Sequence, residues 1–346
     1  MMLQGHFIDT LLAIEYRDLD NIFFKTWTYF RGITAPTFFT ISGMIFTYLL
    51  LKAKEKGDLN FRIRKGIIRG FFLIGVGYII RIPIFTWFTG NFSTSFLVVD
   101  VLQCIGLSLI LIIGLYFLSF KKNIIFSVLS LLLGILIFLY EPLYRNLNNT
   151  NIPFYLNNYI SNTNGSVFTI LPWFGYIAFG AFIATIFHKF LAQKNFKKIA
   201  VILFFSIGLI LIFYSSFILN FIYKITHIKI FNDSASYNYL FTRLGNVFIY
   251  FSLFYHFDKY LKFPLLLKVG QKTLSIYVIH FIIIYGSLTG FGLKQIIGKT
   301  LTPLQGVFGA VLFLVCVCFI SFYYMKSNAY FYSILRKLFF KIKAKK

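Results

Sequence analysis

The sequence predicts an all-α, polytopic membrane protein, a bundle of about ten transmembrane helices with both termini in the cytoplasm. Three observations predict this: an apolar composition, long apolar runs at intervals, and an uneven distribution of basic residues. Of the 346 residues, 58% are hydrophobic and only 13% are charged. Because soluble domains usually carry about a quarter of charged residues, this composition excludes an ordinary soluble protein.

The apolar runs give the expected helices in order. They lie at about 1–14, 32–51, 66–80, 96–118, 123–140, 167–187, 199–219, 240–255, 265–286 and 304–325. Most approach the ~17–25 residues that a helix needs to cross a bilayer, and none alternates with the period of two of a membrane β-strand. We expect residues 1–346 to form a single transmembrane domain.

The basic residues set the expected orientation. The chain has 34 Lys and Arg against 10 Asp and Glu, a net charge of +24. Alternate connections between the runs hold 24 of the 34 basic residues, namely those at 52–69, 119–122, 188–198, 256–272 and 326–346. The positive-inside rule assigns this set to the cytoplasm. The charge is therefore mainly a topology signal, and we expect membrane lipid rather than nucleic acid as the partner.

The first apolar run is short. As a helix it would span only ~21 Å of a ~30 Å hydrocarbon core. We expect either that the first helix is truncated in this sequence or that the segment enters the bilayer only part way. With no basic residue before it, the run does not resemble a cleavable signal peptide.

Ionisable groups inside the apolar runs are the candidates for chemistry, because they are costly there. The expected topology places these groups, and the polar residues that border them, in the outer half of the membrane. The predicted cluster comprises His6, Asp9, Arg31, Arg81, Asp100, Gln103, Trp173, Arg243 and His280.

Two pairs within this cluster have the spacing of one helix face. His6 and Asp9 are three residues apart, and so are Asp100 and Gln103. On such a face Asp9 could orient the imidazole directly or lie beside it on the wall of a cavity, and His6 could act as a general base. The structural alternative is a buried polar network that only fixes helix packing.

A dense basic run at the start of the third apolar segment is a candidate donor site. Arg62, Arg64, Lys65 and Arg69 would form a cytoplasmic mouth that binds a phosphorylated donor through charge-assisted hydrogen bonds. The alternative is a topology signal with attraction to anionic lipid. Cys104, Cys316 and Cys318 show no metal-binding spacing, so we expect no metal.

An ordered series of motifs along nearly the whole chain resembles a known family. The segments are MLQGHFID (2–9), YFRGITAPTFF (29–39), SGM (42–44), VDVLQCIGL (99–107), LPWFGY (171–176) and LSIYVIH (274–280). Together they resemble bacterial proteins related to heparan-α-glucosaminide N-acetyltransferase, within the transmembrane acyltransferase group that includes acyltransferase family 3.

The resemblance implies acyl transfer across the bacterial cytoplasmic (inner) membrane. The donor would be acyl-CoA, usually acetyl-CoA, and the acceptor a hydroxyl or amine of a sugar or glycan on the exported side. The family's catalytic candidate is a histidine of the early helices, and the matching residue is His6. Our hypothesis adds that Asp9 orients it and that Arg62, Arg64 and Arg69 hold the CoA phosphates. The rival functions are a proton-coupled transporter or flippase and a receptor or structural protein. The sequence names neither the acceptor nor an oligomeric state.

Overall fold

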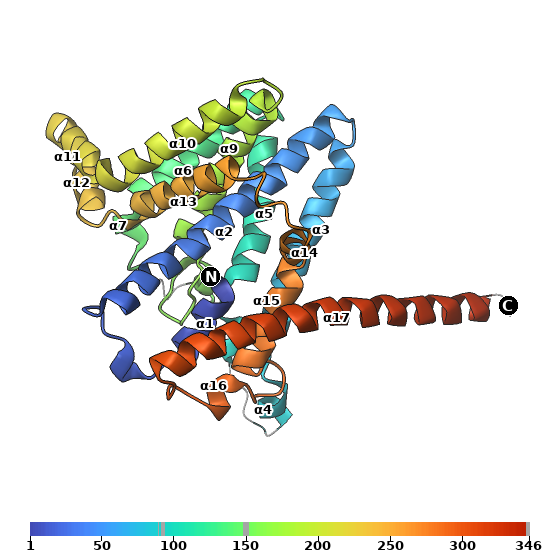
Figure 1. Ribbon diagram of the computed structural model, residues 1–346. Helices are drawn as coiled ribbons and strands as arrows, with labels where there is room; N and C mark the ends of the chain where they lie inside the picture. The colour runs from blue at the N-terminus through green and yellow to red at the C-terminus, as the bar shows by residue number, and fades with distance from the viewer. Residues whose placement is uncertain (89, 91–93, 148–151, 344–346) are drawn as a thin grey trace. The chain divides into compact units, whose positions relative to one another are not determined.

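The computed structural model describes residues 1–88, 90, 94–147 and 152–343, and nearly all of the secondary structure in these ranges is helical (Figure 1). Within them, β-pairing is limited to an isolated bridge between Leu12 and Leu301. The all-α class predicted from the sequence is confirmed.

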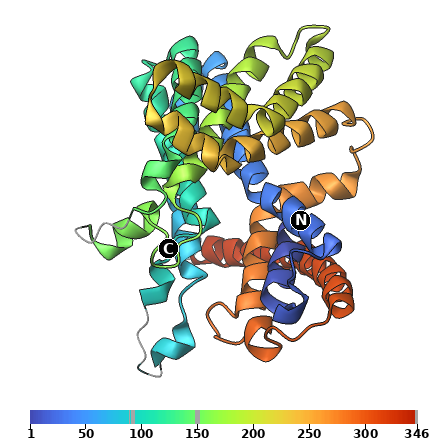
Figure 2. The same cartoon turned by 90° about the vertical axis from the view of Figure 1, so that its left-hand side faces the viewer.

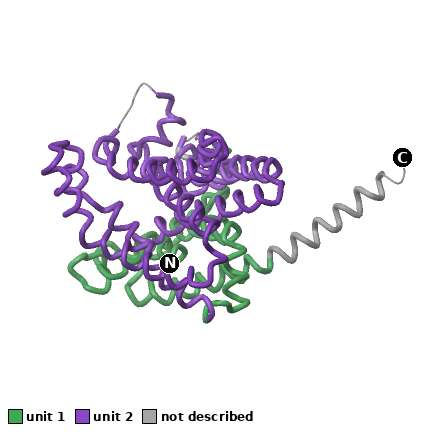
Figure 3. The backbone as a smooth tube through the Cα atoms, turned by 90° about the horizontal axis from the view of Figure 1, so that it is seen from above, with its two compact units in different colours: residues 1–31, 83–92, 260–346 green, residues 32–82, 93–259 purple. Residues whose placement is uncertain are grey.

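The chain divides into two compact units, coloured in Figure 3. Unit 1 comprises residues 1–31, 83–92 and 260–346, and unit 2 comprises residues 32–82 and 93–259. The boundary falls inside the long helix α2 (Ile22–Glu55). The expectation of a single domain over residues 1–346 stays a prediction.

Unit 1 is built on three helices that lie side by side, α1 (blue), α15 (orange) and α17 (red) in Figure 2. Its buried core joins Phe7 and Leu11 of α1 to Ile276 of α15 and Phe313 of α17. Besides the start of α2, its elements are α1 (Met2–Leu11), η1 (Ile14–Tyr16), α4 (Ile84–Phe88), α14 (Pro264–Gln271), α15 (Thr273–Tyr285), α16 (Leu293–Ile296) and α17 (Pro303–Lys343).

Unit 2 contains the remainder of α2 and the central helices. Its closest helix pairs are α10 with α13, α3 with α5, and α6 with α9. The elements are α3 (Leu59–Ile79), η2 (Thr94–Leu97), α5 (Val101–Leu118), α6 (Asn123–Leu139), α7 (Glu141–Tyr144), α8 (Phe154–Ile160), α9 (Ile170–Phe190), α10 (Phe196–Phe213), α11 (Ser215–Thr226), α12 (Lys229–Ser236) and α13 (Tyr239–His256).

Helix forms most of each predicted apolar run. Within the described residues, five helices are long and apolar enough to cross a membrane: α2, α5, α9, α10 and the 303–323 part of α17. The pair α14 and α15 passes the same test together, which raises the number to six. These helices make the chain a multi-pass membrane protein. The total of about ten spans and the side of each terminus stay predictions.

Two runs that the sequence presents as single helices are broken. The run at 199–219 divides into α10 and α11, and the Asn238 amide binds the Ser215 and Ser216 hydroxyls just after the break. The run at 265–286 bends by 69° between α14 and α15. There Gly270, a poor helix former, accepts a hydrogen bond from the Thr273 hydroxyl through its carbonyl oxygen.

Candidate functional site

Helix α1 carries His6 and is held along its apolar face and at its carboxyl end. The apolar side chains of Phe7 and Leu11 are buried against α15 and α17. At its carboxyl end the Arg17 guanidinium donates hydrogen bonds to the carbonyl oxygens of Asp9 (2.8 Å) and Leu12 (2.7 Å). A cation at this position satisfies the last helix carbonyls and complements the helix dipole. A helix of only ten residues is thus fixed in place.

The imidazole of His6 contacts two side chains of α15. Its Nδ1 lies 3.0 Å from the hydroxyl oxygen of Tyr285, within hydrogen-bond distance. Its ring lies 5.1 Å from the ring of His280, measured between centroids. His280 is fully buried, and its Nδ1 lies 3.3 Å from the carbonyl oxygen of Ile276. The structure therefore brings together two histidines that the sequence placed in the predicted cluster.

Asp9 and Arg31, also members of that cluster, form an ion pair. The guanidinium of Arg31 lies 5.7 Å from the ring centre of Trp27, and the Trp27 indole donates a 2.8 Å hydrogen bond to Gln4. These contacts join α1 to the start of α2. The sequence suggests Asp9 as the group that orients the His6 imidazole or lies beside it. In the structure the Asp9 carboxylate pairs with Arg31, and the Nδ1 of His6 lies within hydrogen-bond distance of the Tyr285 hydroxyl.

In unit 2, three further residues of the predicted cluster meet at the start of α5. Arg81 donates a 2.8 Å charge-assisted hydrogen bond to Asp100. Asp100 caps α5 and forms a capping box with Gln103, whose side chain accepts a hydrogen bond from the Asp100 backbone at 3.2 Å. Gln103 is fully buried. These three residues therefore stabilise the start of α5.

Trp173 and Arg243 make other contacts in unit 2. The Trp173 ring lies among aromatic rings, 4.8 Å from Phe168 and 5.1 Å from Phe39 between centroids. The Arg243 guanidinium packs directly on Gly32, where a side chain would collide with it. Trp173 is thus part of an aromatic cluster, and the small residue Gly32 makes room for Arg243.

Tyr285 is the residue at this site that sequence reasoning missed. It lies five positions after His280 in the same apolar run, where an aromatic residue is indistinguishable from one that faces lipid. Its separation from His6 along the chain is 279 residues, so no local pattern connects the two. Only the packing of α1 on α15 brings them together.

The basic run lies at the start of α3. Arg62 and Arg69 are seven residues apart, two helical turns, and so share a face on which their charges repel each other. Arg62 stacks on Phe46 with its Nε buried, and that nitrogen has no hydrogen-bond acceptor among the described residues. Arg64 is exposed and lies about 200° around the helix from Arg62. The donor-site residues predicted from the sequence therefore divide between two faces.

Comparison with known protein families identifies the family of this chain. The family model described as heparan-alpha-glucosaminide N-acetyltransferase, catalytic, matches residues 1–227. The chain belongs to this family. Membership makes it a membrane acetyltransferase. No curated protein and no solved structure matches it.

The family match covers only part of the site. His6, Asp9, Arg31 and the basic run of α3 lie inside the matched residues 1–227. Arg243, His280 and Tyr285 lie beyond them. The two α15 side chains that contact His6 are therefore contributed by a part of this acetyltransferase that the match does not assign.

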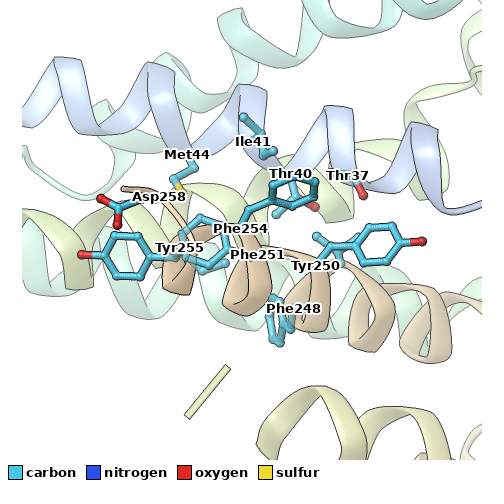
Figure 4. A pocket seen from close by; sticks show the side chains of 12 residues that line it. Thr37, Thr40, Ile41, Met44, Phe248, Tyr250, Phe251, Phe254, Tyr255 and Asp258 are labelled. Atoms are coloured by element: carbon cyan, nitrogen blue, oxygen red, sulfur yellow. The ribbon is translucent and has the colours of Figure 1, made fainter. Parts of the chain in front are cut away.

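Unit 2 of the acetyltransferase also contains a cavity of about 460 Å³ between α2, α9 and α13 (Figure 4). Its walls are largely apolar and aromatic. The hydroxyls of Thr37 and Thr40, which also line it, donate to the carbonyl oxygens of Ile33 and Pro36 within α2. Asp258 lines one end and pairs with Lys197. Across the residues that the structure describes, no cluster of His, Cys, Asp and Glu has the form of a metal site.

Proposed function

We propose that this chain transfers an acetyl group from acetyl-CoA, bound from the cytoplasm, to a hydroxyl or amine of a sugar or glycan on the exported side. The proposal rests on the setting of His6. This histidine lies in the family-matched region, on a firmly packed helix, and its ring is within hydrogen-bond distance of a side chain. A histidine in this setting suits general-base catalysis. Polysaccharide modification at the bacterial inner membrane is the corresponding role.

In the proposed reaction, the Nε2 of His6 takes the proton of the acceptor hydroxyl or amine as that group attacks the thioester carbonyl. The carbon–sulfur bond then breaks, CoA leaves as a thiolate, and the imidazolium returns the proton to it. Direct attack needs no acyl-enzyme. Transfer through an acylated histidine is the second route that the same residue permits.

The donor site is proposed on α3. Arg62 and Arg69 place two guanidinium groups on one face, where their positive charges repel each other. Phosphate oxygens would provide acceptors and balance the repulsion between the two charges. Lys65, three residues after Arg62, lies on the same face. Arg64, on the other face of α3, would contribute less to donor binding.

Acetyl transfer in membranes tests the proposal. We expect His6→Ala to reduce transfer of label from acetyl-CoA by about 100-fold or more, the usual contribution of a general base. His256→Ala is the matched control, because His256 is an exposed histidine at the end of α13. Undiminished transfer by membranes with His6→Ala would contradict the catalytic role.

A second measurement separates an acetyltransferase from the transporter or flippase that intramembrane His and Asp could also serve. Acetyl-CoA should raise the thermal unfolding temperature of the purified protein, because a ligand that binds only the native state stabilises it. A transporter of an unrelated solute should not respond. No shift at saturating acetyl-CoA would favour the transporter.

A further inference from the structure

We propose that Tyr285 is the positioning residue of His6: its hydroxyl oxygen accepts a hydrogen bond from Nδ1–H and so holds the imidazole in the tautomer whose Nε2 can accept a proton. The inference rests on the proposed function, in which His6 is the base. It adds a residue that lies outside the family match.

The distance between the two groups permits this hydrogen bond. The His6 Nδ1 and the Tyr285 hydroxyl oxygen are 3.0 Å apart, and both belong to unit 1. The two rings meet nearly edge to face, with an interplanar angle of 83°. The ring of His280 packs on the same imidazole at a centroid distance of 5.1 Å. Two side chains of α15 therefore restrict both the rotation and the plane of the His6 ring.

The end of α15 holds Tyr285 in place. The helix stops at Gly286, which has a positive φ of 67° and donates its N–H to Ile282. Gln295 donates to the carbonyl oxygen of Tyr285 at 3.3 Å and accepts from the Gly292 N–H at 3.0 Å. The Tyr285 ring also packs on Phe281, 4.6 Å between centroids. The backbone and the ring of Tyr285 are therefore both fixed, which places its hydroxyl beside His6.

The direction of the hydrogen bond decides the chemistry. A neutral imidazole carries one N–H, so a proton on Nδ1 leaves the lone pair of Nε2 available. If Tyr285 instead donated to Nδ1, the proton would lie on Nε2, which could then not act as a base. When Nε2 takes the proton of the acceptor, Nδ1–H continues to donate to the tyrosine oxygen.

The charge of Asp9 does not compete for this position. The Asp9 carboxylate is paired with Arg31 in unit 1. Its negative charge is balanced there, and its effect on the imidazole is electrostatic rather than a hydrogen bond to Nδ1. Tyr285 thus takes the orienting role for which the sequence pointed to Asp9.

A spectroscopic test does not depend on activity. In protein labelled with ¹⁵N-histidine, the His6 signals are identified by their loss in His6→Gln. We expect the wild type to show a protonated Nδ1 and an unprotonated Nε2, and Tyr285→Phe to show a mixture of tautomers. A wild-type spectrum with the proton on Nε2 would overturn the inference.

Kinetic measurements provide a second test of the inference. We expect Tyr285→Phe to lower kcat for acetyl transfer about 10-fold and to leave the KM for acetyl-CoA unchanged, because the hydrogen bond at Nδ1 sets which ring nitrogen carries the proton. Tyr323→Phe, at an exposed tyrosine of α17, should match the wild type. Wild-type kcat in a folded Tyr285→Phe variant, with His6→Ala inactive, would defeat this inference alone. An active His6→Ala variant would defeat the proposed function and leave the tautomer result standing.

Discussion

At the scale of single residues, the ionisable groups of the apolar segments are balanced by specific partners. Asp9 pairs with Arg31, and Asp100 with Arg81. An unpaired charge in hydrocarbon would cost several kcal/mol, so each pair makes its helix compatible with the membrane. Asp100 has the additional role of capping α5.

Asp100 variants should separate capping from ion pairing. Asp100→Asn keeps an acceptor for the Val101 N–H and loses the charge, whereas Asp100→Ala loses both. We expect Asp100→Ala to lower the free energy of unfolding by about 1 kcal/mol more than Asp100→Asn, measured by thermal unfolding in detergent.

The control is Asp58→Ala. Asp58 precedes α3 but makes no side-chain capping hydrogen bond. Its removal should change the unfolding temperature little. Equal unfolding temperatures for Asp100→Ala and Asp100→Asn would show that the cap contributes nothing.

Arg62 and Arg69 should govern donor affinity. We expect Arg62→Gln and Arg69→Gln to raise the KM for acetyl-CoA about 10-fold each with kcat unchanged, because a charge-assisted phosphate contact contributes about 1.5 kcal/mol or more. Lys56→Gln, in the exposed connection between α2 and α3, is the control. A fall in kcat at unchanged KM would place these arginines elsewhere in the reaction.

At the scale of elements, helices α2 and α9 meet through glycines. A Cβ on Gly43 would collide with the backbone of Ile177, and a Cβ on Gly180 with the backbone of Thr40. Small residues allow this close approach, which is a common form of helix packing in membranes. Hydropathy revealed the two helices but not that they pair.

Alanine at either glycine should therefore destabilise the protein. We expect Gly43→Ala and Gly180→Ala to lower the free energy of unfolding by about 1–3 kcal/mol, because the backbones must separate. Gly75→Ala on α3, where no atom lies within 4 Å of the new Cβ, should be neutral or stabilising. Thermal unfolding of the purified variants measures all three. An unfolding temperature raised by Gly43→Ala would contradict the close contact.

At the scale of the whole molecule, the apolar side chains that face outward indicate a lipid environment. In the span-length windows of α10 and α17 only 22% and 28% of the residues are buried. Phe205, Ile202 and Leu203 on α10 are among the exposed residues. In water such a surface would be an aggregation site, whereas in hydrocarbon it is the expected exterior.

The predicted topology has a direct test with single cysteines. Lys56→Cys lies in a connection expected in the cytoplasm, and Asn162→Cys in one expected outside; both positions are exposed. A membrane-impermeant maleimide should label Asn162→Cys in intact cells, and Lys56→Cys only after permeabilisation. The unmodified chain gives the background from its own cysteines. The reverse pattern would invert the orientation.

The sequence by itself determined the membrane class, the helical segments, the family and the candidate base. Each depends on local information: apolar length indicates a span, and spacing places His6 and Asp9 on one face. The sequence did not reveal the breaks before Ser215 and Thr273, because the apolar runs continue through them.

Only the tertiary structure decided which side chains meet. His6 contacts Tyr285, 279 residues away in the chain, and Asp9 forms an ion pair with Arg31. Arg62 shares a helix face with Arg69, whereas Arg64 lies on another face. The physical reason is that hydropathy indicates how deep a residue lies in the bilayer. It does not indicate the rotation of a helix about its axis or the neighbour that it packs against, and those two properties decide the partners of His6.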